Sequence, residues 1–73
     1  MRLQDQRKKK GYSQSELSSA SGVSLRMIQK YEIGERNIDN AKIETLCDLA
    51  IALDVKVYDI VESPSLREKL KKS

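Results

Sequence analysis

The sequence predicts an all-α fold built as one compact domain. No stretch alternates apolar and polar residues for long enough to form a half-buried strand. Between residues 43 and 53 the apolar residues recur three and four positions apart, which is the helical period. At 73 residues the chain is too short to divide its apolar surface between two cores. The apolar residues of that periodic stretch are Ile43, Leu46, Leu49, Ala50 and Leu53.

Glycines and serines mark three short helices in the first half of the chain. The stretch 3–10 contains no helix breaker and ends at Gly11, so we expect a helix there. Ser13 and Glu16 have the spacing of a capping box, which predicts a second helix from 14 to about 21 with Ala20 turned inward. Gly22 then permits a tight turn, in which Val23 is buried, and Ser24 caps a third helix over about 25–32.

The second half is predicted to hold two more helices. Gly34 ends the third helix, and a polar loop with a short helical turn after Asn37 follows. A helix over about 42–53 ends at Asp54, since Asp tolerates the backbone conformation that Gly more often adopts there. Val57, Ile60 and Val61 indicate a fifth helix that ends before Pro64. We therefore expect a domain over 1–63 and a frayed basic tail over 64–73.

Composition excludes several classes of function. With one Cys and no His, the chain offers neither a disulfide framework, nor an ordinary zinc site, nor a catalytic scheme that depends on imidazole. No Gly-rich phosphate loop or pair of carboxylates indicates an enzyme, and no cofactor is expected. The sequence has no apolar run that would cross a membrane and no secretion signal, so we expect a cytoplasmic protein.

The charges are distributed unevenly. Residues 1–36 hold eight Lys or Arg against four Asp or Glu, and residues 37–63 hold two against six. The last ten residues hold four against one. An anionic partner is therefore expected to meet the first half of the chain.

The second and third predicted helices have the form of a DNA-binding helix-turn-helix. They are short, they are joined by a tight turn with a glycine, and the later one combines a narrow apolar stripe of Ile28 and Tyr31 with a wide polar face. Such a polar face suits the major groove, where Arg pairs with guanine, Gln with adenine, and an apolar side chain with the thymine methyl group. The side chains on this face are Ser24, Leu25, Arg26, Gln29 and Lys30.

The motifs of the chain resemble those of the lambda-repressor-like helix-turn-helix family, also called the Cro or Xre type. The resemblance covers about residues 3–62 and includes Gly34 and the pair Arg36-Asn37. Its main segments are Ser13-Gln14-Ser15-Glu16-Leu17, Ser21-Gly22-Val23-Ser24, Ile28-Gln29-Lys30-Tyr31-Glu32, Glu44-Thr45-Leu46 and Leu49-Ala50. It implies a five-helix domain that binds double-stranded operator DNA, usually as a homodimer, and represses or activates transcription. We expect a repressor that acts by occupying promoter DNA.

The resemblance also implies roles for single residues. Gln14 would touch the DNA backbone or a base, and Leu25, Arg26 and Lys30 fall on base-reading positions with Gln29 beside them. Ser24 is mainly a helix cap that can also contact a phosphate. Arg36 and Asn37 fall where the family binds phosphate.

Other side chains are better explained by structure. Arg7 occupies a position where the family uses an ion pair within the fold, and Glu32 is the candidate partner. Cys47 replaces an aliphatic residue, so we interpret it as a small buried hydrophobe. Ile51 and Tyr58 stand where the family has polar residues, which suggests that Ile51, Val55 and Tyr58 form a two-fold contact between protomers.

A second function stays open beside DNA binding. The same fold serves as a protein-interaction module or an antitoxin whose main partner is a protein. The two alternatives differ in what they require of residues 25–32, because a module that binds only protein has no need of Arg26, Gln29 and Lys30 on one exposed face.

Overall fold

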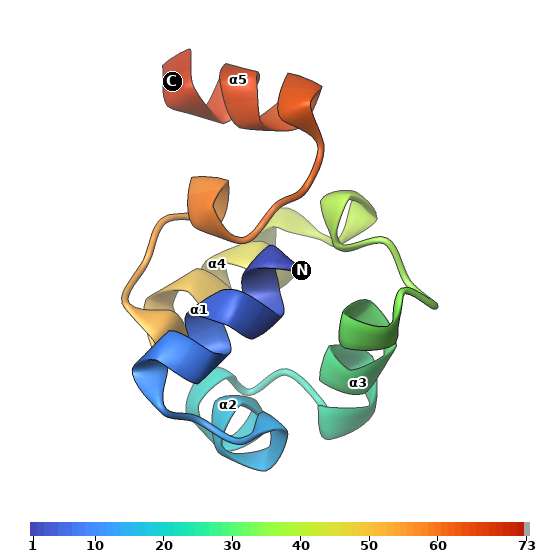
Figure 1. Ribbon diagram of the computed structural model, residues 1–73, viewed down its shortest axis with the longest axis vertical. Coiled ribbons are helices and arrows are strands. Elements are labelled where there is room, and N and C mark those ends of the chain that lie inside the picture. Colours follow the sequence, from blue (N-terminus) through green and yellow to red (C-terminus); the bar gives the residue numbers. More distant parts are fainter. Residues whose placement is uncertain (73) are drawn as a thin grey trace.

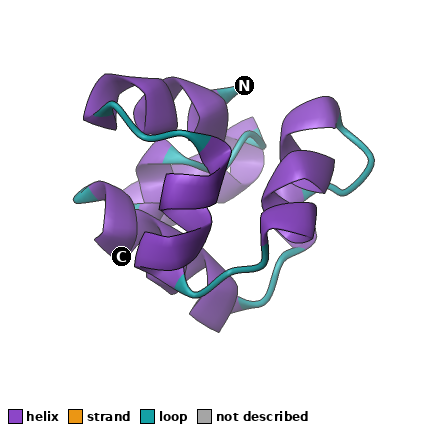
Figure 2. Cartoon of the chain, turned by 90° about the horizontal axis from the view of Figure 1, so that it is seen from below, coloured by secondary structure: helices purple, strands orange, loops and turns teal. Residues whose placement is uncertain are grey.

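The computed structural model describes residues 1–72 as a small bundle of helices without strands in that range (Figure 1; Figure 2). None of these helices is long and apolar enough to span a membrane. The elements are α1 (Arg2–Lys10), α2 (Gln14–Ser21), α3 (Leu25–Ile33), the one-turn 3-10 helix η1 (Ile38–Asn40), α4 (Ile43–Leu53), a second one-turn 3-10 helix η2 (Val57–Asp59) and α5 (Pro64–Lys72). The expected all-α domain is confirmed.

Local signals in the sequence account for most helix ends. Glu16 N donates to Ser13 Oγ at 3.0 Å, and Ser13 N donates to Glu16 Oε1 at 2.8 Å, so the capping box begins α2 as predicted. Asp54 ends α4 with φ of 57°, which confirms the left-handed conformation expected of it. The short turn expected after Asn37 is η1.

The core is built around α4, which packs against α2, α1 and η2. The fully or nearly buried apolar side chains are Leu3, Leu17, Val23, Ile28, Tyr31, Ile38, Leu46, Leu49, Ala50, Leu53, Ile60 and Val61. Three expectations about the core are wrong. Ile43 is 65% exposed because it lies in the first turn of α4, Ala20 is exposed on α2, and Cys47 is only half-buried.

The predictions for residues 57–72 were also wrong. Val57–Asp59 form only one helical turn, closed by the bond from Lys56 N to Asp59 Oδ2, and Ile60 and Val61 are buried in the connection that follows. The expected frayed tail is instead the helix α5, while Ser73 lies outside the described residues. Proline suits the first position of a helix because that position needs no backbone donor.

Long-range polar contacts hold the start of α5. The carboxylate of Asp39, in η1, accepts from Glu62 N at 2.7 Å and from Ser63 N at 3.0 Å. Ser63 Oγ accepts from Leu66 N at 3.3 Å, as an N-cap does. Glu62 Oε2 in turn accepts from Arg2 N at 2.6 Å at the start of α1. Asp39 and Glu62 thus join α5 to η1 and α1.

The body of α5 rests on η2. Leu66 and Leu70, one helical turn apart, pack against the core. The guanidinium of Arg67 lies 3.9 Å from the centre of the Tyr58 ring, and its Nη1 donates to Tyr58 O at 3.0 Å. Along the longest axis of the molecule α5 lies at one end and α2 at the other (Figure 1).

Replacing Asp39 with Ala should loosen α5 selectively. Two backbone N–H groups lose their acceptor, and removal of a side chain that caps a helix in this way costs about 1 kcal/mol. We expect faster amide hydrogen exchange in residues 66–72, unchanged exchange in α2, and a melting temperature about 4–8 °C lower.

The matched control is Asp5→Ala, since Asp5 is exposed and makes no side-chain hydrogen bond within residues 1–72. Equal exchange in α5 for the two variants would contradict the role given to Asp39.

Candidate nucleic-acid interface

Two serines fix the turn between α2 and α3. Ser18 Oγ donates to Val23 O at 2.7 Å, and Val23 N donates to Ser21 Oγ at 3.1 Å. Gly22 has φ of 77°, a conformation that costs a residue with a side chain more than it costs glycine. The side chain of Val23 is also buried. The turn is therefore fixed both by hydrogen bonds to its backbone and by apolar packing in the core.

The third helix presents the face that the sequence predicts. Ser24 Oγ accepts from Met27 N at 3.2 Å and caps α3, while Ile28 and Tyr31 anchor the helix in the core. The structure leaves the five predicted side chains of this segment outside the core. Ser24, Leu25, Arg26 and Gln29 are exposed and Lys30 is half-buried.

Ile33 belongs to this face but was not among the predicted residues. It is 69% exposed and follows Leu25 and Gln29 at intervals of four residues. The spacing alone would have identified it. An apolar side chain here enlarges the apolar part of a surface that is otherwise polar.

The loop after α3 carries two more predicted residues. Gly34 ends α3 with φ of 82°, and Arg36 and Asn37 are both exposed beyond it. Asn37 Oδ1 accepts from Asp39 N at 2.9 Å, so its carbonyl side is used within the fold. The amide N–H groups of Asn37 therefore remain as donors for an anion.

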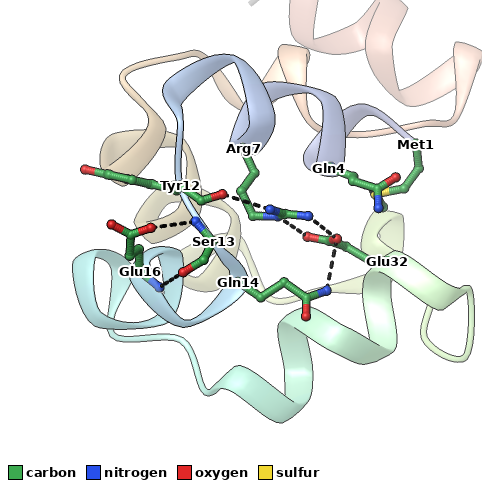
Figure 3. A network of polar contacts seen from close by, with 8 residues as sticks. All are labelled: Met1, Gln4, Arg7, Tyr12, Ser13, Gln14, Glu16 and Glu32. Atoms are coloured by element: carbon green, nitrogen blue, oxygen red, sulfur yellow. Dashed lines mark hydrogen bonds and ion pairs between the residues drawn. The ribbon is translucent and has the colours of Figure 1, made fainter.

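Gln14, at the start of α2, is bonded to α3. Its Nε2 donates to Glu32 Oε1 at 3.1 Å (Figure 3). Arg7 approaches the same carboxylate from α1, with Nε 2.8 Å from Oε2 and Nη2 2.9 Å from Oε1. The expected Arg7–Glu32 ion pair is confirmed, whereas the bond from Gln14 was not foreseen. No local pattern connects residues 14 and 32, so no signal in the sequence would have shown it.

The ion pair is buried and its members are well hydrogen-bonded. The side chains of Arg7 and Glu32 are 10% and 2% exposed, and Arg7 Nη1 also donates to Tyr12 O at 2.8 Å. Burial by itself raises the pKa of Glu32, but the hydrogen bonds from Arg7, Gln14 and Gln4 and the charge of Arg7 outweigh it and lower that pKa. Glu32 is therefore ionised at neutral pH.

The proposed contact between protomers lies away from this face. Ile51, on α4, is 76% exposed, as the sequence predicts. Val55 and Tyr58 are half-buried, and Arg67 covers one face of the Tyr58 ring. Ile51 lies near the end of α4, Val55 in the connection that follows and Tyr58 in η2, so one continuous stretch of chain carries them.

The groups exposed on the α3 face are suited to binding a ligand through hydrogen bonds and charge. Guanidinium, ammonium, amide and hydroxyl groups stand on it together with two aliphatic side chains, and they offer hydrogen bonds and positive charge. Within residues 1–72 no group of His, Cys, Asp and Glu has the arrangement of a metal site.

A protein-family model described as "Helix-turn-helix" matches residues 3–60 of the chain. The match begins in α1 and ends at Ile60, just after η2, so it includes the whole of the α2–turn–α3 unit. Searches of curated proteins and of solved structures returned no match.

We expect the intact Arg7–Glu32 pair to be important for the free energy of unfolding. Arg7→Met leaves an unpaired buried carboxylate and should lower the free energy of unfolding by about 3 kcal/mol. The double variant Arg7→Met with Glu32→Leu removes both charges and should unfold less easily than Arg7→Met alone. Chemical denaturation measures both; a double variant less stable than Arg7→Met would contradict this account.

The same pair predicts a sensitivity to acid. Because folding lowers the pKa of Glu32 from its ordinary value of 4.5, its stabilisation is complete above that pH and is lost as the pH falls through the folded-state pKa. In Glu32→Gln the loss of stability below pH 4.5 should be shallower than in the wild type. Glu16→Gln should show the same change to a smaller degree, because hydrogen bonds from Ser13 lower the pKa of that carboxylate as well but its side chain is exposed.

Proposed function

Because the chain belongs to the Cro/Xre-type helix-turn-helix family, we propose that it is a sequence-specific, double-stranded-DNA-binding regulator of transcription that acts as a repressor. The observation that carries the proposal is the outer face of α3. Ser24 caps α3, and the apolar side of the helix is buried in the core. The side chains that remain exposed are able to recognise bases. We also propose that the protein is cytoplasmic and has no enzymatic activity.

In the proposed complex α3 enters the major groove. Arg26 would form two hydrogen bonds with a guanine, Gln29 with an adenine, and Leu25 would contact a thymine methyl group. Lys30 adds a positive charge on the same face. Bases are thus selected by the α3 side chains that the core leaves outside.

Contacts with phosphate would set the position of α3 along the DNA. Arg36 and the free amide of Asn37 are donors in the loop after α3, and Ser24 lies at the helix start. Gln14 would touch the backbone or a base from α2. These contacts carry no sequence information of their own unless they reach a base edge.

A homodimer would place two copies of α3 on one side of the DNA, about 34 Å apart, so that the half-sites are about 10 base pairs apart from centre to centre. We propose that Ile51, Val55 and Tyr58 form the contact between protomers. Support comes from the high exposure of Ile51 and from its place outside the α3 face. Occupation of promoter DNA would then repress transcription by steric exclusion.

Selection of duplexes from a random DNA pool at about 0.1 M salt tests this function. We expect an inverted repeat whose half-sites are about one helical turn apart. Arg26→Ala should relax one position of the motif and cost about 1–3 kcal/mol, whereas Arg36→Ala should weaken all sequences alike and make binding less dependent on salt. If the folded protein enriches no DNA motif, the result would favour the alternative, a module or antitoxin whose main partner is a protein.

Self-association tests the proposed dimer contact. Ile51→Lys combined with Tyr58→Lys should shift sedimentation toward the monomer and weaken binding to the inverted repeat, because two buried charges would repel across the two-fold axis. Ile43→Lys serves as the control, since Ile43 is also an exposed isoleucine of α4. Unchanged sedimentation of the double variant would reject the contact.

A further inference from the structure

The outer side of α4 carries exposed residues that neither the proposed DNA contacts nor the proposed contact between protomers uses. We propose that the N-terminal part of this side binds a basic amphipathic helix of another protein. The docking surface consists of Ile43, Glu44, Cys47 and Asp48. This inference goes beyond the proposed DNA-binding function and does not depend on it, because the partner is bound without DNA.

One row of the docking surface is apolar. Ile43 is 65% exposed, and Cys47, one helical turn later, is half-buried. Ile51 continues the row by a further turn, but it belongs to the proposed contact between protomers. Since the core leaves most of the Ile43 side chain in water, burial of this side chain against a partner is favourable.

The row beside it is acidic. Glu44 is exposed and Asp48, again one turn later, is half-buried. Three of the six acidic residues between 37 and 63 accept hydrogen bonds from backbone N–H groups of the fold. The other three lie on α4 or at its C-cap and have neither an ion pair nor a side-chain hydrogen bond among residues 1–72. They are Glu44, Asp48 and Asp54.

The fold itself accounts for only one of these three charges. Glu44 lies in the first turn of α4, where the helix dipole favours an acidic residue. Asp48 repels Glu44 from one turn further on, and Asp54 stands at the C-cap, where the dipole disfavours negative charge. Cations from a partner would relieve this repulsion. The acidic row therefore selects a partner that presents Lys or Arg, and it excludes nucleic acid, whose phosphates it would repel.

The spacing of the two rows suits a helix as the partner. Both rows repeat at about one turn of α4, roughly 6 Å, so a second helix laid along α4 meets them turn by turn. Its apolar residues would pack on the apolar row while its Lys or Arg residues pair with the acidic row. The basic helix of this chain, α5, is not free to do so, because Leu66 and Leu70 already pack against the core.

The docking surface is separate from the α3 face. The helix α4 packs against α2, α1 and η2, and in Figure 1 it lies behind α1, whereas α3 lies at one side of the bundle. A partner on α4 and DNA on α3 would thus meet different helices. The protein would then hold both at once and bring the partner to the DNA site.

Titration with a designed peptide tests the inference. The probe is a synthetic helix of about 15 residues in which leucines and lysines form two adjacent rows on an alanine background, and its control has glutamate in place of lysine. We expect the lysine peptide alone to shift the backbone amide resonances of α4, and to bind more weakly at about 1 M salt. Equal binding of both peptides, or shifts spread evenly over the protein, would overturn the inference.

A matched pair of variants tests the acidic row. Glu44→Gln combined with Asp48→Asn should weaken binding of the lysine peptide by about 2- to 30-fold, because two exposed ion pairs are lost. Asp5→Asn combined with Glu35→Gln removes the same charge from exposed carboxylates on other elements and should leave the affinity unchanged. Equal weakening in the two double variants would show attraction by net charge alone and would reject the surface.

A second pair tests the apolar row. Ile43→Ser should weaken binding of the lysine peptide, whereas Ile33→Ser, at a similarly exposed isoleucine of α3, should not. The two replacements remove the same apolar side chain from positions outside the core, so both variants should fold. No difference between them would contradict the role given to Ile43.

Three further results distinguish the inference from the proposed function. A DNA motif that changes in the Glu44→Gln and Asp48→Asn variant would place the surface in the DNA interface, and altered sedimentation of that variant would place it between copies of this chain. Either result overturns the inference. A wild type that selects no DNA motif but binds the lysine peptide on α4 fails the proposed function and supports the inference.

Discussion

The buried ion pair between Arg7 and Glu32 determines how the first three helices fit together. The two residues are 25 positions apart in the chain and belong to α1 and α3. The bond from Arg7 to Tyr12 O adds the connection before α2, and the bond from Gln14 adds the first turn of α2. Within residues 1–72 a core of twelve buried apolar side chains packs these helices together. Apolar contacts have little directionality, whereas the hydrogen bonds around Glu32 are directional and fix the relative orientation of the helices.

The fold could be predicted from the sequence as far as local rules determine it. Capping by Ser13 and Ser24, the glycines that end helices and the left-handed conformation of Asp54 depend on neighbouring residues and were visible. The end of the chain depends on distant ones. Val57, Ile60 and Val61 fit a helical period, but the carboxylate of Asp39, more than 20 residues away, fixes residues 62 and 63 and lets a new helix begin at Pro64.

The candidate site likewise has some features that local patterns predict and others that depend on contacts between separate helices. The face of α3 could be predicted because helical spacing turns Arg26 and Gln29 away from Ile28 and Tyr31 and leaves Leu25 at the edge of the buried stripe. The family resemblance suggested an ion pair of Arg7 with Glu32, but the bond from Gln14 joins side chains from separate helices, and no period in the sequence encodes it. Ile43 shows the converse case, since its spacing fits the buried stripe although the first turn of α4 extends beyond the core.

Acidic residues beside a surface that meets DNA would ordinarily weaken binding through repulsion of phosphate. Here Glu32 is neutralised by Arg7, and the charge of Asp39 is met by the backbone N–H groups that precede α5. Each of these acidic residues also fixes one amide side chain at the candidate interface, Gln14 through the carboxylate of Glu32 and Asn37 through the backbone N–H of Asp39. The two amides are left with different groups outward, a carbonyl and an N–H on Gln14 and only N–H groups on Asn37. The N–H groups left on Asn37 suit an anion, although the sequence alone gives Asn37 and Gln14 the same amide chemistry.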